Sequence, residues 1–599
     1  MRRIWFVVLM CTALSSVPHA QDALTARQRT ADLNQLASFY AKNYAPYEWK
    51  RDVFGFDLFD LRPWLREIHH ADDLDFQEVL IDYVASLNDA HDYIAFPTIF
   101  SVSLGLSVDI YDGKVLIDAI NRAMLPESQY PFVVGDEVIA VDRQPVQGLI
   151  RSFRKYAISA NQRSTDRTAA SRIVSRNQQI MPHIPELGDS ASVVIRHAST
   201  GATATYDIPW SKIGIPLTSQ GPVPSPGRWR SVGRSFDSQT EGGMSLSSEL
   251  EPPAISGLTL PATPTLYSVA ETVAPDNTLP SYMRPVAPLL NVGVGQDYYS
   301  VLNFGSRIPI YGPPPGFVLR LGASATDFFL SGTFVANGVR LGLIRIPTMS
   351  PPNIALALQQ LDQEIQYFNQ NTDGLVVDVM RNPGGLVSFV EAAAQRFIPT
   401  PFRTMGFEIR ATAAWLASFA SQLTLAELSN APPEVIQNLR NIYNEVLSAY
   451  NENRGRSEPV PLNSTGSFTL LPAPNAYTKP ILVLVDEFSA SGGDMFPALL
   501  QDNQRATIFG MRTMGAGGSV VGFNATAYTE SFFRITVSLM NRGRLVQSPG
   551  FPPAPYIENI GVQPDIFQDY MTRANLVSAG APFRQAFTTA IVNMVQQAP

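Results

Sequence analysis

The spacing of hydrophobic positions changes along the chain, and each change marks a predicted region. Up to about residue 95, apolar residues recur every three or four positions, as in LNQLASFYAKNY and FQEVLIDYVASLND, which predicts helices. Between about 100 and 210 the apolar runs are short, as in KVLIDAI and ASVVIRHA, which is typical of β-strands. We therefore predict a helical N-terminal domain over residues 21–99 and a β-rich domain over residues 100–210.

Residues 133–149, VVGDEVIAVDRQPVQGL, add detail to the β-rich region. They combine a Gly-Asp turn, a strand and a second turn, an order that is similar to that of PDZ domains. A generic β-hairpin has the same local pattern and is the alternative. The prediction is a PDZ-like domain over residues 100–210.

From about residue 330, continuous apolar runs alternate with amphipathic helices. The stretches VRLGLIRIP, GLVVDVM and ILVLV read as buried strands, and NIALALQQLDQEIQYFN and LVSFVEAAAQRFI read as helices. Such runs are typical of parallel strands that are covered on both faces. We predict an α/β core over residues 291–599, in which a sheet rich in parallel strands has flanking helices and a helical insertion at 406–455 interrupts the pattern.

Residues 211–290 have a different character from their neighbours. They are rich in Pro, Ser and Gly and lack long apolar periodicity. A segment of this composition cannot readily bury enough surface to offset its ordering entropy, so we predict a long flexible insertion. Apolar stretches such as ISGLTLPATPTLYSV (255–269) favour docking onto the rest of the chain, and a linker without a regulatory role is the alternative.

Composition and charge argue against several classes of function. The chain has 599 residues, 45% of them hydrophobic, which is enough for several domains with ordinary cores. Its formal net charge is −8 and it has no basic run, which argues against nucleic acid as a partner. The sequence contains neither a metal-binding motif nor a GxxxxGK[ST] phosphate loop, so it implies no metal and no cofactor.

Residues 1–20, MRRIWFVVLMCTALSSVPHA, read as a secretory signal peptide. A basic start at Arg2 and Arg3 precedes an apolar stretch that is too short to span a membrane, and Ala20 is a small residue at the expected cleavage site. We expect export to the periplasm or the cell exterior, without stable membrane insertion. Cleavage would also remove Cys11, the single cysteine, so no disulfide is expected in the mature protein.

Two strand–turn–helix junctions could carry chemistry. They are VVDVMRNPGGLVSF (376–389) and LVDEFSASGGDMF (484–496), and in an α/β sheet ligands bind beyond the carboxyl ends of the strands. The second junction has serines at its bend, Ser489 and Ser491. A serine at such a bend can be an exposed nucleophile, but it needs a base that takes its proton.

The glycines of these turns could bind a developing negative charge. Ser491 is predicted at the N-terminus of a helix, where unpaired amides and the helix dipole favour anions. The N–H of Gly492, with that of Gly384 or Gly385, could then form an oxyanion hole for acyl transfer. Plain glycine turns at strand ends are the alternative for each junction.

These stretches resemble the S41 family of serine peptidases, the C-terminal processing or tail-specific proteases. The match lies in DGLVVDVMRNPGG (373–385) and VDEFSASGGDMFPALLQDNQRATIFG (485–510). The resemblance implies that residues 291–599 are a catalytic core that hydrolyses peptide bonds, with Ser491 rather than Ser489 as the nucleophile. Polypeptide substrates are then the expected partners.

One part of the family pattern is missing. Most members pair the serine with a lysine in a downstream Phe-Gly-Lys-Gly stretch, whereas this chain reads TMGAGGSV (513–520), with Ala516 at the lysine position. The last lysine of the sequence is Lys479, so no lysine further along the chain can replace it. The Ser–Lys dyad of the family is therefore absent.

A smaller branch of the family, which includes the tricorn core protease and the chlamydial protease-like activity factor, uses histidine and glutamate instead. By resemblance, SLNDAHDY (86–93) supplies His91 as general base, and YIENIGVQPDI (556–566) supplies Glu558, which orients the imidazole. The other candidates for these two roles are His69, His70, His183, His197, Asp494, Asp502, Glu530 and Asp565.

The resulting hypothesis is an exported serine endopeptidase that acts through Ser491, His91 and Glu558. The alternative is a catalytically inactive scaffold that binds peptides or protein C-termini through its PDZ-like domain. The resemblance further implies that residues 211–290 could be an internal inhibitory segment that is removed by self-cleavage, which would make the chain a zymogen. The sequence leaves the oligomeric state open, a homodimer included.

Overall fold

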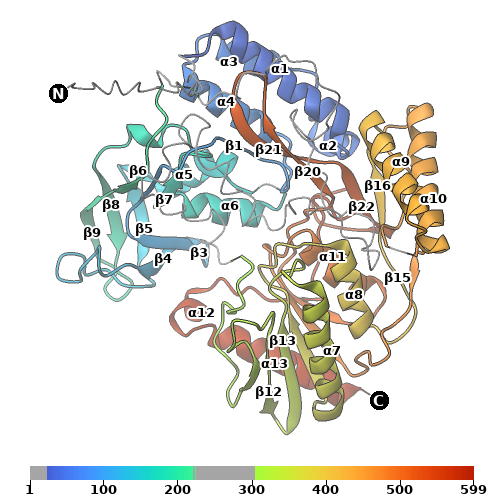
Figure 1. The fold of residues 1–599 in the computed structure, drawn as a ribbon. Coiled ribbons are helices and arrows are strands. Elements are labelled where there is room, and N and C mark those ends of the chain that lie inside the picture. Colours follow the sequence, from blue (N-terminus) through green and yellow to red (C-terminus); the bar gives the residue numbers. More distant parts are fainter. Residues whose placement is uncertain (1–22, 159, 220–222, 224–303, 464, 599) are drawn as a thin grey trace, which may run out of the picture.

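The computed structural model describes residues 23–158, 160–219, 223, 304–463 and 465–598. The predicted signal peptide and most of the insertion 211–290 lie outside the described residues. Figure 1 shows that the helical N-terminal region lies beside β20 and β21, which come from the far end of the chain. Among the described residues, no helix combines the length and the apolar character that crossing a membrane requires.

The N-terminal region is helical, in agreement with its apolar spacing. Helix α1 begins with a capping box, in which the Thr25 side chain accepts a hydrogen bond from the Gln28 N–H and the Gln28 side chain accepts one from the Thr25 N–H. Asp72 caps α4 in the same way. The apolar faces of these helices pack into one core with strands β20 and β21. The helices are α1 (Ala26–Asn43), α2 (Tyr47–Phe54), α3 (Arg62–Ile68) and α4 (Asp73–Ala85).

The β-rich region contains an antiparallel sheet in the order β3-β4-β5-β8-β9, to which β6 adds at β5. A second small sheet has the order β10-β2-β7, and β10 includes the first residues after position 210. The strands are β2 (Ser101–Ser103), β3 (Leu106–Tyr111), β4 (Lys114–Ile120), β5 (Glu137–Val141), β6 (Gln144–Pro145), β7 (Ser175–Asn177), β8 (Ser190–Arg196), β9 (Thr203–Pro209) and β10 (Ser211–Ile213). The helices are α5 (Val146–Phe153), η1 (Arg154–Tyr156), α6 (Gln162–Ser171) and η2 (Ile184–Glu186).

The C-terminal core is built on a seven-stranded sheet with the order β11-β12-β13-β14-β18-β19-β24. Strands β13, β14, β18, β19 and β24 are parallel, as their apolar runs predict, whereas β12 is antiparallel to both of its neighbours, β11 and β13. The sheet is therefore mixed, because β12 and β13 are joined by a tight hairpin. Its strands are β11 (Val318–Leu321), β12 (Leu330–Ala336), β13 (Val339–Arg345), β14 (Gly374–Asp378), β18 (Ile481–Val485), β19 (Thr507–Gly510) and β24 (Ile566–Phe567).

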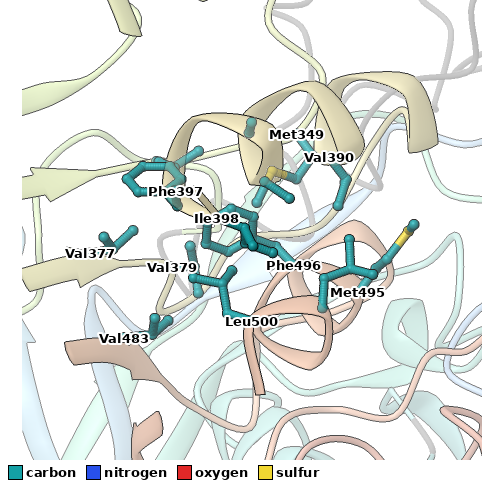
Figure 2. Close-up of a cluster of buried hydrophobic side chains, with 14 of the residues drawn as sticks. Met349, Val377, Val379, Val390, Phe397, Ile398, Val483, Met495, Phe496 and Leu500 are labelled. Carbon is teal, nitrogen blue, oxygen red and sulfur yellow. The ribbon is translucent and has the colours of Figure 1, made fainter. Parts of the chain in front are cut away.

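Helices cover both faces of this sheet. Val377 and Val483 belong to the core under α7, α8 and α11, whereas the neighbouring Val376 and Leu482 belong to the core under α13. Figure 2 shows the first of these cores, where the strand side chains meet residues of α8 and α11. The two-residue alternation explains why the strands are apolar throughout. The helices are α7 (Ile354–Asn371), α8 (Val387–Phe397), α11 (Gly492–Asp502), α12 (Arg573–Val577) and α13 (Ala581–Gln597).

Smaller sheets connect this core to the N-terminal helices. Strand β1, which follows His91 closely, pairs antiparallel with β21, so that Ile94 lies opposite Phe533. Helices α9 (Ala413–Leu428) and α10 (Pro433–Asn451) lie within the range 406–455 predicted as a helical insertion, whose first residues form strand β16 instead. The remaining strands are β1 (Ile94–Ala95), β15 (Phe402–Arg403), β16 (Gly406–Ile409), β17 (Thr469–Leu470), β20 (Val520–Ala525), β21 (Glu530–Thr536), β22 (Ser538–Val546) and β23 (Ala554–Tyr556).

Candidate active site

Ser491 lies in the turn between β18 and α11, directly before the helix begins. Its φ of 54° and ψ of −115° put it in a region that L-residues rarely adopt, and such strain is found at functional turns when the surroundings hold it. Its side chain is 5% exposed. Ser489, by contrast, is fully buried, and its Oγ donates to the carbonyl of Val379 at 2.9 Å. Ser489 therefore has a structural hydrogen bond that Ser491 does not share.

The glycine turn after β14 packs directly against this serine. A Cβ atom on Gly384 would lie 2.6 Å from both the Gly492 nitrogen and the Ser491 Cβ, so no side chain fits there. The Gly384 N–H donates to the Asn382 Oδ1 at 2.8 Å. Within the described chain, no hydrogen bond engages the N–H of Gly385 or of Gly492. Gly385, rather than Gly384, thus has an N–H group that is free to bind an anion.

Asp494 joins the nucleophile turn to the loop 513–517. One carboxylate oxygen accepts the Ser491 N–H at 2.8 Å and the Ala516 N–H at 3.0 Å, and the other accepts the Gly515 N–H at 2.9 Å. Burial raises the pKa of Asp494 to about 7, although the donors around it favour the carboxylate. The loop that replaces the family's lysine stretch is therefore fastened to the serine turn through this side chain.

Replacing Asp494 by asparagine is expected to destabilise the fold and to lower turnover. An asparagine amide group would face backbone N–H donors, and each buried donor left without an acceptor costs about 1–3 kcal/mol. Thermal melting of Asp494→Asn should show this loss. The control is Asp362→Asn, which removes a side chain that is 53% exposed from a surface pair with Arg396 and should cost at most about 0.5 kcal/mol. Equal melting of the two variants would contradict the role of Asp494.

Glu558 follows β23 and lies on the other side of the same loop. Its side chain is fully buried, and one oxygen accepts the Gly517 N–H at 3.0 Å. The other oxygen lies 2.5 Å from the Nζ of Lys50, with which it forms a salt bridge. Burial, together with the charge of Asp89, raises the pKa of Glu558, and the charge of Lys50 opposes this rise. The carboxylate is thus held by the loop 513–517 and by α2.

His91 lies on the loop between α4 and β1. Its backbone N–H donates to the Asp89 Oδ1 at 2.8 Å, and its side chain is buried. Burial lowers the pKa of His91 to about 4, and the positive charges of Arg534 and Lys50 add to this effect against that of Asp89. The imidazole is therefore neutral near pH 7, the form that a general base needs.

The expected contact between His91 and Glu558 is not made in this structure. The His91 Nδ1 is buried and has no hydrogen-bond partner among the described residues. The Glu558 oxygens are taken by Lys50 and by the Gly517 N–H. The Nδ1, which an orienting carboxylate would bind, is therefore without a hydrogen bond from any described residue.

Packing connects the histidine loop with the nucleophile turn. Ala90 packs against a small cluster that contains Ala490, Met514 and Ala516. The pairing of β1 with β21 and a hydrogen bond from the Thr536 N–H to Asp92 fix the loop on its other side. Ala90 and Ala490 each precede a predicted catalytic residue, so the two segments meet although 400 residues separate them.

The other candidates have structural partners elsewhere. His69 and His70 contact each other after α3, and His197 bonds to Asp136 and Tyr206 in the β-rich region. His183 pairs with Asp75 and Glu186, and Asp502 pairs with Arg542 and Arg544. Asp565, which lies immediately before β24, accepts a hydrogen bond from the Ile508 N–H. Glu530 is buried in β21.

Sequence reasoning missed three charged residues near this site, namely Lys50, Asp89 and Asp92. Asp89 lies within the SLNDAHDY stretch that points to His91, so the motif itself could have drawn attention to it. Lys50 has no comparable signal, because it lies in a short helix with exposed charged neighbours. Among the described residues, no group of His, Cys, Asp and Glu is arranged to hold a metal ion.

The fold and these motifs define a peptidase domain joined to a PDZ domain. Residues 340–567 match the model of peptidase family S41, and residues 101–215 match that of a PDZ domain. The chain therefore contains an S41 peptidase domain and a PDZ domain, which confirms the predicted resemblance and supports a serine protease.

The chain is also similar to curated relatives and to solved structures over most of its length. A protein of Chlamydia trachomatis serovar D is 26% identical over 94% of this chain and 92% of its own, and one of Chlamydia pneumoniae is 27% identical over 97% and 93%. A structure described as mature CPAF complexed with lactacystin is 22% identical, covers 96% of this chain and 99% of its own, and has a TM-score of 0.68. This last likeness shows that the two chains share a fold.

Proposed function

We propose that the protein is a serine endopeptidase in which Ser491 is the nucleophile, His91 the general base and Glu558 the carboxylate that supports the base. The observation that carries the proposal is the loop 513–517. Through Asp494 this loop is joined to Ser491, through the Gly517 N–H it is joined to Glu558, and its Ala516 packs in one cluster with Ala90.

The proposed chemistry is that of a serine peptidase. The Ser491 Oγ attacks the carbonyl carbon of the scissile peptide bond and passes its proton to the neutral imidazole of His91. The N–H groups of Gly385 and Gly492 stabilise the oxyanion that forms. The imidazolium then protonates the leaving amine, and a water molecule hydrolyses the acyl-enzyme in the same two steps.

The carboxylate of Glu558 supports the imidazolium by its charge. Catalytic hydrogen bonds are often long or absent without substrate and shorten when it binds, which agrees with the open Nδ1 of His91. A peptide substrate is favoured because Ser491 and Glu558 lie within the residues that match the peptidase model, and a PDZ domain accompanies that domain in the chain.

An active-site fluorophosphonate probe tests the proposal directly. Labelling of the folded protein that is lost in Ser491→Ala supports the enzyme. A folded protein that does not react with the probe, but binds peptides, would instead favour the scaffold with a PDZ domain.

We further propose that the protein is exported and made as a zymogen, on the basis of the signal-peptide pattern in residues 1–20 and the composition of residues 211–290. Exposed flexible chain is where proteolytic nicking concentrates. Purified protein is expected to cut itself within 211–290, to keep the fragments associated, and to gain activity as cutting proceeds. Mass spectrometry of the wild type beside Ser491→Ala checks this, and identical processing of both would refute self-cleavage.

A further inference from the structure

Lys50 is a fully buried lysine whose ammonium group lies at the candidate active site. It comes from α2, more than 400 residues before the nucleophile in the sequence. Its Nζ lies 2.5 Å from the Glu558 Oε1, 2.7 Å from the Asn559 Oδ1 and 2.8 Å from the carbonyl oxygen of Asn88. Each of these atoms is a hydrogen-bond acceptor.

Three acceptors identify the protonation state of Lys50. A lysine ammonium group has three N–H donors and no acceptor, whereas the neutral amine has only two N–H donors. The three contacts therefore match the charged form, and its lack of a free electron pair rules out a role as the base for Ser491. Lys50 is therefore not a displaced member of a Ser–Lys dyad, and its function must come from the groups to which it donates hydrogen bonds.

The residues that Lys50 contacts belong to two loops, one carrying His91 and the other carrying Glu558. Asn88 lies three residues before His91, and Asn559 directly follows Glu558. The Asn559 side chain also donates to the Asn88 carbonyl at 2.8 Å, so the loops are bonded to each other as well. Lys50 thus fixes the position of Glu558 relative to the loop of the general base.

Lys50 also balances negative charge in this interior. Glu558, Asp89 and Asp92 are all buried. Among the described residues, Lys50 forms an ion pair with Glu558, and no lysine or arginine forms one with Asp89 or Asp92. Asp89 accepts hydrogen bonds from the Tyr44 hydroxyl and from a backbone N–H, which carry no full charge. Without Lys50, proton uptake would be the way for Glu558 to avoid a buried unpaired charge.

We propose that Lys50 is a positioning residue of the peptidase, which keeps Glu558 ionised and holds it in register with the His91 loop. The inference rests on the proposed function of Glu558 and adds a residue to it that acts only through that carboxylate. It predicts that the loss of Lys50 lowers turnover when residue 558 can carry a charge, and that it leaves turnover unchanged when residue 558 cannot.

A double-mutant cycle tests this dependence. The variants are Lys50→Met, Glu558→Gln and the two combined, with Lys42→Met, an exposed lysine at the end of α1, as the matched control. For each, kcat and KM are measured on a peptide substrate from pH 5 to pH 9. Lys50→Met is expected to lower kcat about 100-fold with KM within about twofold. The combined variant should match Glu558→Gln within about threefold.

The pH profile supplies a readout that a merely structural lysine would not move. Loss of a neighbouring cation raises the pKa of a carboxyl group, so Lys50→Met should need a higher pH than the wild type to reach its maximal kcat. The titratable groups that act on Glu558 are Tyr44, Asp89, Asp92 and Lys50, and all except Lys50 stay in place in this variant. The control and the Glu558→Gln variants should show no such shift.

The outcomes separate this inference from the proposed function. If wild type is active and Ser491→Ala is not, but Lys50→Met keeps its kcat and pH profile, the role of Lys50 is refuted and the peptidase stands. A further loss in the combined variant equal to that in Lys50→Met alone would also refute it. If Lys50→Met does not fold, Glu558→Gln is compared with the combined variant, in which both members of the ion pair are removed. Equal kcat values support the role of Lys50, and a further loss in the combined variant refutes it. An inactive wild type would refute the proposed function instead.

Discussion

Replacing Ser491 by alanine should reduce peptide turnover at least about 10⁴-fold and leave the fold intact. The Oγ of Ser491 is the atom that forms the acyl-enzyme, and removal of the nucleophile leaves only the contribution of binding and of the oxyanion hole. The substitution deletes one oxygen and keeps a Cβ in the same strained backbone. Turnover of a peptide substrate and thermal melting, measured on the same preparation, check both halves of the expectation.

Ser489→Ala is the matched control, because it removes the same atom two residues earlier. Ser489 donates to the Val379 carbonyl and also contacts Asp486, so its loss should cost about 1–3 kcal/mol of stability. It should keep reactivity toward a fluorophosphonate at temperatures where it is folded. If Ser489→Ala were unreactive and Ser491→Ala active, the assignment of the nucleophile would be wrong.

Replacing His91 by alanine should lower kcat/KM by about 10⁴-fold at neutral pH, because the serine then has no base. In the wild type, the base works only when it is neutral, so kcat/KM should rise as pH increases through the pKa of His91. Since burial lowers this pKa to about 4, the limb that belongs to His91 should lie near pH 4 instead of near the ordinary 6.5. The ionisation of Glu558, whose pKa burial raises to about 7, gives a separate limb at higher pH that should be missing in Glu558→Gln. Initial rates on a peptide substrate between pH 3.5 and pH 8 measure it.

The same pKa predicts a dependence of stability on pH. His91 binds a proton less readily in the folded than in the unfolded protein, so its contribution is fully present above about pH 6.5 and is lost as pH falls toward 4. The size is at most about 3 kcal/mol. His91→Ala should remove this dependence, and His183→Ala, a partly exposed histidine with surface partners, should not. Near-normal turnover of His91→Ala would point to a different base.

Much of the fold was readable from local patterns. The run ILVLV predicted a buried strand because both of its faces are covered, and β18 has all five residues buried. The antiparallel hairpin of β12 and β13 and the sheets around β20 to β23 were not predicted. In those strands buried polar residues such as Arg534 and Asn541 interrupt the apolar pattern, and their burial depends on partners far away in the sequence.

In the candidate site, too, local sequence identified some residues, and other features depend on tertiary contacts. Ser491 and the glycines belong to local turns, where backbone conformation follows from the residues at hand, and a motif therefore identified them. Gly384 and Gly385 are adjacent and alike in sequence, and in the structure the hydrogen bond from the Gly384 N–H to Asn382 distinguishes them.

By itself, the sequence determined that this chain has an S41 peptidase core and a PDZ domain, and it identified the serine turn, because these depend on periodicity and on residues close together in the chain. Tertiary structure alone decided that Lys50 meets Glu558. The physical reason is that a buried charge is tolerated only beside a partner, and that partner is selected by packing in space rather than by spacing along the chain.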